Sequence, residues 1–405
     1  MTAPRVRSAL AYALFFAAVG SFAPYLPLYY RQLGFELGEI GGLLAIGPLI
    51  GLAAAPSWGA LSDRHHGSPL VLVAPIAASL IGTGMLATGN ELAVLAGAAV
   101  LGLGLAGLLP ILDARALEAA GATRSGYGPI RAWGSVGYVV AALGTGAIIE
   151  VFGLQSQLAA LAVALVATGV VGLTLRPGTE RIVLGAASRP IRDAGRLFGP
   201  KGLGVFLLGV FLAWLGMSAV LSFTPLRFEE LGAGATIIGL GGAIAAAIEV
   251  PIMLRYPALA ARFGAATLLV AGAGFLALRS VVAALASSPE VLLAASIFGG
   301  IGYALFLVAG VTWVSTRVPR HLAATAQGIF QGVGSNLSQV TAAAFGGAIA
   351  AVVGIDGLFA AAAGLGVAAM AIIVIAVRPS AAGPATGIAK GDDNDVPRIS
   401  RRSPA

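Results

Sequence analysis

Four ionisable residues lie inside or beside long apolar stretches of this 405-residue chain: Asp113, Arg131, Glu249 and Arg279. A charge at the centre of a membrane-spanning helix costs roughly 2.5–3.5 kcal/mol on insertion scales. Such a residue therefore pairs with another charge, lines water-filled space or binds a polar ligand. These four residue types can bind a solute and move protons, which makes them the candidates for function.

Asp113 and Arg131 lie on either side of a short polar segment at 121–126. Each is nine residues from position 122, inside that segment. Two antiparallel helices joined there would carry both side chains at similar depth, which predicts that they face each other. The alternative is that both are interfacial and solvated. Arg115 and Glu118 are expected to be interfacial charges.

Glu249 and Arg279 form a second candidate pair around a loop expected near residue 262. They lie 13 and 17 residues from it, and a difference of four residues is ~6 Å of helical rise, within reach of an arginine. Burial favours a neutral carboxyl group and a nearby guanidinium favours its charged form. A change in their separation would therefore bind or release a proton. The alternative is a structural ion pair.

The composition of the chain indicates whether these charged residues are surrounded by water or by lipid. Hydrophobic residues make up 58% of the chain and charged residues 10%, against roughly 25% charged in soluble proteins. A soluble enzyme, a DNA-binding domain and a disordered chain are therefore excluded. The chain has no cysteine, and its three histidines, His65, His66 and His321, fall in expected loops. We therefore expect neither an enzyme nor a cofactor.

Charged residues divide the chain into twelve apolar stretches near the roughly 20 residues that cross a bilayer. They lie at about 8–30, 40–62, 68–89, 92–112, 132–149, 151–175, 203–226, 231–248, 263–286, 291–316, 323–355 and 357–377. If both termini are inside, 20 of the 24 Lys and Arg residues fall in cytoplasmic segments, and only Arg31 and Arg227 lie in outer loops. The positive-inside rule therefore predicts two cytoplasmic termini.

The spans divide into two halves that resemble each other. At an offset of 198, Gly34 falls on Gly232, and at 201, Gly153 falls on Gly354. Because six is even, both halves enter the membrane in the same sense, as parallel repeats about an axis along the membrane normal. We expect an N-terminal six-helix bundle, a cytoplasmic linker, a C-terminal six-helix bundle and a disordered tail, at 1–176, 177–202, 203–378 and 379–405.

The loop between the second and third spans, Gly59-Ala60-Leu61-Ser62-Asp63-Arg64-His65-His66-Gly67, is similar to the loop that the major facilitator superfamily carries there. The resemblance implies a cytoplasmic gate formed by Gly59, Asp63, Arg64 and Gly67. Gly59 would allow close helix contact, and Asp63 would form an ionic latch to the other half. The alternative is a solvated charge pair worth ~0–1 kcal/mol.

Further segments resemble the lactose permease and phenylpropionate permease groups of proton symporters in this superfamily. They are Phe15-Phe16, Pro56-Ser57-Trp58-Gly59 and Tyr127–Gly137. The resemblance covers nearly all of the chain up to Arg378 and implies an all-α integral membrane protein. It implies substrate binding by Asp113 and Arg131, and proton coupling by Glu249, Arg279 and Asp113. The sequence departs from lactose permease at 298–303, which holds no carboxylate or imidazole.

Several other residues are candidates for substrate binding. Tyr25 belongs to a stripe with Ser21 and Tyr29, and Gln331 belongs to one with Gln327, Ser335 and Gln339. Residues four apart share a helix face, so each stripe could line a wet cavity or make hydrogen bonds between helices. Trp133 lies in the fifth-helix segment. Trp214 could stack on a ring or pack as an ordinary aromatic.

Together these observations predict a proton-driven symporter that imports a small organic solute by alternating access. An aromatic acid, a sugar and a nucleoside remain open as substrates. The protein is expected to be a monomer of the cell membrane that takes energy from the proton gradient and binds no nucleic acid. The alternative is an efflux antiporter, which is less favoured because span five lacks the proline of that group's helix-five motif.

Overall fold

The computed structural model describes residues 3–65, 68–120, 127–175, 203–318 and 323–377, and it is helical throughout those ranges apart from short turns. The predicted linker at 177–202 and tail at 379–405 lie outside the described residues. The helices are α1 (Ala3–Phe22), α2 (Leu26–Gln32), α3 (Leu37–Arg64), α4 (Leu70–Ala87), α5 (Glu91–Ala120), α6 (Tyr127–Phe152), α7 (Ser156–Leu173), α9 (Leu203–Glu230), α10 (Ala235–Phe263), α11 (Ala265–Ala284), α12 (Pro289–Arg317), α13 (Ala323–Gln331), the π-helix η2 (Gly332–Leu337) and α14 (Ser338–Val377).

Eleven helical stretches among the described residues are long and apolar enough to cross a membrane. The first predicted span is broken into α1 and α2, because Pro24 and Pro27 disturb the helical hydrogen bonds around the turn. The last stretch runs over 52 residues, from Ala326 to Val377. Non-helical dihedral angles at Gly354 (φ 78°, ψ 170°) interrupt it, one residue from the predicted end of the eleventh span.

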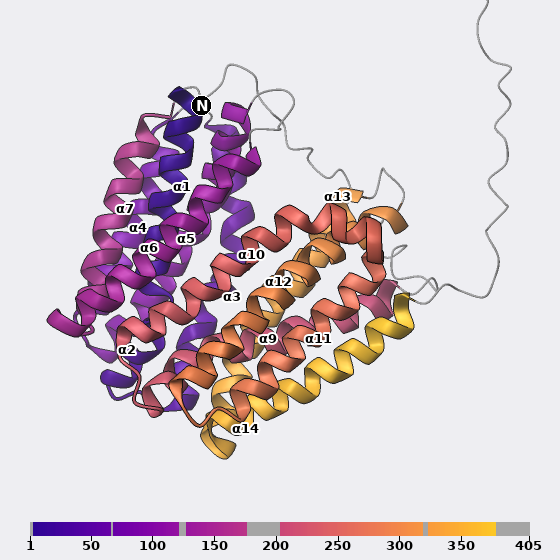
Figure 1. The fold of residues 1–405 in the computed structure, drawn as a ribbon. Coiled ribbons are helices and arrows are strands. Elements are labelled where there is room, and N and C mark those ends of the chain that lie inside the picture. The colour runs from indigo at the N-terminus through magenta and orange to yellow at the C-terminus, as the bar shows by residue number, and fades with distance from the viewer. Residues whose placement is uncertain (1–2, 66–67, 121–126, 176–202, 319–322, 378–405) are drawn as a thin grey trace, which may run out of the picture.

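The described helices form two bundles that lie side by side (Figure 1). In the first, α1 packs against α6 and α7, while α5 packs against α3 and α4. In the second, α14 packs against α9 and α11, and α12 packs against α10 and α11. Where the connection between two helices is described in full, a short turn reverses the chain, and the helix ends gather at two ends of the bundles. We name these the Arg31 end, where α2 ends, and the Arg64 end, where α3 ends.

The bundles meet along two crossings, α3 with α14 and α6 with α10. In the first crossing, a Cβ atom on Gly41 would lie 2.7 Å from the Cα atom of Gly347. In the second, a Cβ atom on Gly146 would lie 2.8 Å from the Cα atom of Thr236. Both distances are too short for a side chain, so glycine lets the backbones touch. These contacts lie toward the Arg31 end of the seam between the bundles.

The backbone repeats its turns at the matched positions of the two halves. Gly34 and Gly232 both have positive φ, at 95° and 78°, and so do Gly153 and Gly354, at 81° and 78°. A positive φ is readily adopted only by glycine. The offsets of 198 and 201 in the sequence therefore reflect equivalent backbone geometry.

Candidate functional site

Glu249 and Arg279 lie at the same depth on neighbouring helices. α10 ends at Phe263 and α11 begins at Ala265, so Gly264 is the turn, 15 residues from each charge. Glu249 is half-buried and Arg279 is 9% exposed. The two interact electrostatically, but no ion pair within 4.0 Å joins them in the described structure. The two charges are therefore near each other, and the structural ion pair that was the alternative is not formed among the described residues.

Arg279 is directed toward α12 instead. A Cβ atom on Gly299 would lie 2.8 Å from Cδ and 3.0 Å from Nε of Arg279, so the missing side chain of Gly299 makes room for this arginine. Nε of Arg279 is buried and has no hydrogen-bond partner among the described residues. A buried donor without a partner is costly. Nε of Arg279 can therefore donate a hydrogen bond to a partner that the described residues do not supply in this conformation.

Asp113 binds tyrosines instead of Arg131, which corrects the predicted pairing. Its carboxylate accepts a hydrogen bond from Tyr12 on α1 and one from Tyr127 on α6, the latter at 2.7 Å. Tyr127 lies one turn before Arg131 on α6, so the two residues share a face of that helix and the tyrosine is the one that reaches Asp113. No ion pair within 4.0 Å joins Asp113 to Arg131 in the described structure.

Arg131 reaches toward the seam between the bundles. Its guanidinium lies over the ring of Phe16, 5.6 Å from the ring centroid. The hydroxyl of Tyr303 on α12 interacts electrostatically with both Arg131 and Glu249. Glu249 also interacts with Tyr138 on α6. At the seam, one hydroxyl group therefore interacts electrostatically with an arginine of the first bundle and with a glutamate of the second.

Two further candidates take part in packing. Tyr25 is fully buried, and its hydroxyl donates to the carbonyl oxygen of Ala142 at 2.5 Å, so the alternative of an interhelical hydrogen bond holds. Trp214 is 4% exposed and packs edge-on against Tyr303, with ring centroids 5.6 Å apart. Its indole Nε1 is buried without a partner in the described structure. Trp214 thus packs against the tyrosine whose hydroxyl interacts electrostatically with Arg131 and Glu249.

Trp133 and Gln331 lie away from this cluster. Trp133 is 48% exposed, and two residues along a helix correspond to about 200° of rotation, so it points away from the side of α6 that carries Arg131. Gln331 is exposed at the last position of α13, where the π-helix begins. The structure therefore does not bring either side chain to the residues that face the seam.

The structure describes the predicted gate only in part, at Gly59 and Arg64. A Cβ atom on Gly59 would meet nothing within 4 Å, so the expected close helix contact is absent there. Arg64 is exposed at the end of α3. The side chain of Asp63 and the whole of Gly67 lie outside the described residues. Close packing in this region comes instead from Gly107, where a Cβ atom would lie 2.7 Å from the ring of Trp58.

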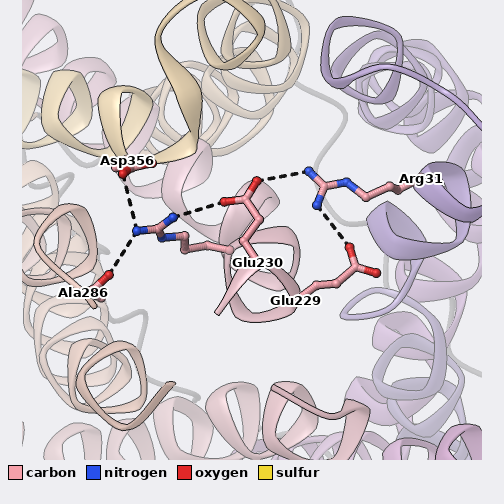
Figure 2. A network of polar contacts seen from close by, with 6 residues as sticks. Arg31, Glu229, Glu230, Ala286 and Asp356 are labelled. Carbon is pink, nitrogen blue, oxygen red and sulfur yellow. Dashed lines mark hydrogen bonds and ion pairs between the residues drawn. The ribbon is translucent and has the colours of Figure 1, made fainter. Parts of the chain in front are cut away.

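The opposite end carries an ionic network that the sequence analysis did not anticipate (Figure 2). Arg31 pairs with Glu229 at 3.1 Å and with Glu230 at 3.4 Å, which joins the two bundles. Arg227 pairs with Glu230 at 3.2 Å and with Asp356 at 3.4 Å within the second bundle. The backbone N–H of Thr236 also donates to Glu150 across the seam, at 3.0 Å.

The repeat itself contained the signal for this network. Arg31 and Glu229 differ by 198, the offset that relates the two halves, so they are equivalent positions. Equivalent positions that touch lie on the axis relating the two copies. Opposite charges at matched positions would have predicted the contact. Tyr12 and Gly299 carried no comparable signal, because one tyrosine or one glycine in an apolar span is ordinary.

Comparisons with known proteins place this geometry in a family. The family model described as "MFS_1 like family" matches residues 6–361. The chain is 29% identical to the maltose permease of Geobacillus stearothermophilus, covering 64% of this chain and 66% of the permease. It is 22% identical to the uncharacterized transporter YwbF of Bacillus subtilis (strain 168), covering 60% of each. The match thus spans slightly less than two thirds of these relatives.

Solved structures share the fold over nearly the whole chain. The nucleoside transporter NupG superposes with a TM-score of 0.82 at 18% identity, covering 94% of this chain and 100% of that one. A bacterial homologue of the lysosomal transporter Spinster, in an inward-facing and occupied conformation, superposes with a TM-score of 0.74 at 16% identity, covering 92% and 96%. Since the family model matches most of the chain, this protein is a member of the MFS_1 like family and a multi-pass protein of the cell membrane.

Proposed function

We propose that this protein moves a small organic solute by alternating access and couples that movement to protons. The observation that carries the proposal is the charge arrangement at the seam. Glu249 is half-buried and interacts electrostatically with Arg279 and with the hydroxyl of Tyr303, and no ion pair within 4.0 Å joins it to Arg279 among the described residues. A carboxyl group near a mobile or competing positive charge changes its proton affinity when the charge moves. Rocking of one bundle against the other would supply that movement.

The proposed topology has twelve crossings with both termini in the cytoplasm. The two arms of the last stretch would cross separately, turning at Gly354 as the first half turns at Gly153. This places the Arg64 end in the cytoplasm. The ionic and glycine contacts between the bundles gather at the Arg31 end. In this proposal the conformation is therefore inward-facing: the bundles touch at the outer end and are apart at the cytoplasmic end. This also accounts for the open surroundings of Gly59.

Substrate recognition is proposed to use Arg131 and the tyrosines around it. Asp113 already accepts two tyrosine hydroxyl groups, so it acts here by orienting Tyr12 and Tyr127. Hydroxyl groups beside aromatic rings and an arginine suit a polar ring compound with several hydrogen-bonding groups. The relatives' names point the same way, to maltose for one and to nucleosides for another. A sugar and a nucleoside are the first solutes to test, followed by an aromatic acid.

Transport by purified protein in liposomes tests the proposal. Counterflow of radiolabelled maltose, uridine and phenylpropionate identifies the solute, and an imposed inward proton gradient then tests coupling. We expect accumulation by the natural protein. Glu249→Gln should lose accumulation and keep counterflow, because exchange needs no net proton transfer. Glu91→Gln, at an exposed glutamate at the start of α5, is the matched control. Accumulation that ignores the gradient, or survives Glu249→Gln unchanged, overturns proton coupling.

A further inference from the structure

A cavity outside the seam opens at the Arg64 end of the first bundle. Its volume is about 270 Å³, and α1, α5 and the end of α7 form its wall. Arg7, Ser8, Arg115 and Glu118 provide its charged and hydroxyl groups. One water needs roughly 10–15 Å³ of such space, so the cavity can hold a group much larger than water. None of these residues faces the second bundle's charges described above.

Two polar atoms in the cavity residues have no partner in the described structure. The hydroxyl oxygen of Ser8 is buried in a residue that is 2% exposed, and Nη1 of Arg115 is buried as well. A buried guanidinium that leaves one donor unused is costly, since charged groups pay the largest desolvation penalty. Both atoms belong to residues of the cavity wall. A hydrogen-bond acceptor in the cavity would satisfy both atoms once these two side chains turn toward it.

The remaining charges favour an anion. Arg7 donates to the carbonyl oxygen of Thr174 at 3.4 Å, and Arg5 donates to that of Ala119 at 3.2 Å, so arginines already neutralise the carbonyl ends of α7 and α5. Glu118 is engaged in contacts of its own and interacts electrostatically with Arg115. Two arginines against one glutamate leave the wall with a charge of +1.

We propose that this cavity binds a phosphate group, with Arg115 and Ser8 as donors and Arg7 as a second positive charge. A guanidinium presents its N–H groups in a fork that matches phosphate oxygens. The location rests on the proposed topology, which places the cavity at the level of the cytoplasmic headgroups, where anionic lipids concentrate. The phosphate can therefore come from an anionic phospholipid or from a small soluble phosphate. The binding residues are the same in both cases.

Binding to the full-length purified protein tests the inference without any transport step. Native mass spectrometry and thermal unfolding compare phosphatidylglycerol, phosphatidylcholine and inorganic phosphate. We expect phosphatidylglycerol or inorganic phosphate to bind and raise the unfolding temperature, and phosphatidylcholine to do neither. A response to the lipid alone identifies a lipid site, and a response to inorganic phosphate identifies a soluble ligand.

Variants connect the binding to the cavity. Arg115→Gln should weaken it roughly tenfold or more, as expected for loss of a charged donor, whereas Arg115→Lys should retain most of it. Arg255→Gln, at an exposed arginine near the Arg64 end of α10, is the matched control. If Arg115→Gln folds poorly, Ser8→Ala gives a second, milder reading of the same site. No selective binding, or equal binding by Arg115→Gln and the natural protein, overturns the proposal and leaves a water-filled cavity.

Discussion

Removing Arg31 should release the Arg31 end of the seam. Arg31→Gln deletes both ion pairs between the bundles, to Glu229 and to Glu230. The three side chains are 29%, 43% and 32% exposed, so solvent screens the pairs. Exposed pairs contribute about 0.2–1 kcal/mol each. Two pairs therefore favour the closed end by about 0.4–2 kcal/mol, and their loss should raise the ratio of open to closed molecules roughly 2–30-fold.

Distances between two spin labels measure that ratio directly. The chain has no cysteine, so introduced cysteines are the only labelling sites. Gln155 and Ser287 are exposed, lie between helices at the Arg31 end, and belong to different bundles. The natural background should show mainly one short distance. Arg31→Gln should add a longer distance, and high salt should shift the natural protein in the same direction by screening the pairs.

Arg227→Gln provides the matched control. It removes the same residue type at the same end, but its partners, Glu230 and Asp356, belong to its own bundle. Its distance distribution should stay within about twofold of the natural protein, since no pair between bundles is lost directly. If Arg31→Gln leaves the distribution unchanged, or both variants shift it equally, the ion pairs to Glu229 and Glu230 do not hold this end closed.

Three other substitutions test the packing around the candidate site. Gly299→Ala should displace Arg279 and lower the initial rate of proton-driven uptake while changing the unfolding temperature little, because the added methyl meets a side chain rather than backbone. Gly41→Leu should separate the seam, because its side chain meets the backbone of Gly347, and the spin-label distance should lengthen more than in Arg31→Gln. Tyr127→Phe removes a 2.7 Å hydrogen bond and should cost about 0.5–1.5 kcal/mol, seen as weaker solute binding or a lower unfolding temperature.

Each of these has an outcome that contradicts it. Normal proton-driven uptake by Gly299→Ala would show that the position of Arg279 is unimportant for coupling. An unchanged spin-label distance in Gly41→Leu would mean that the crossing of α3 and α14 adapts without opening. Solute binding and stability that both survive Tyr127→Phe would remove the proposed orienting role of the carboxylate it contacts.

Counting residues along the helices predicted well how deep a charged side chain lies in the bundle, and poorly which neighbour it points to. The turn expected near 262 lies at Gly264, so Glu249 and Arg279 are level, whereas the expected turn gave an offset of four residues, ~6 Å of rise. Rise per residue is the same in every α-helix, which makes depth a matter of counting. The direction of a side chain depends on how each helix rotates against its neighbours. Arg279 therefore points to Gly299, which spacing could not reveal.

The apolar stretches were also easier to predict than the breaks within them. Hydropathy marks the lengths of the spans because charged residues are excluded from lipid. It does not register local backbone geometry, so the turn that divides α1 from α2 and the π-helix at Gly332–Leu337 were missed. Pro24 and Pro27 were a usable signal for the first. The π-helix interrupts a run of small and polar residues with no comparable marker.

The contact between Arg31 and Glu229 has a consequence for how the halves recognise each other. Two copies of the first bundle would bring arginine against arginine, and two copies of the second would bring glutamate against glutamate. Only a mixed assembly places opposite signs on the shared axis, since like charges repel across a contact. The two halves, made as separate chains, should therefore prefer each other to themselves. One pair of opposite charges at equivalent positions therefore distinguishes the correct pairing of the two halves from pairing of either half with itself.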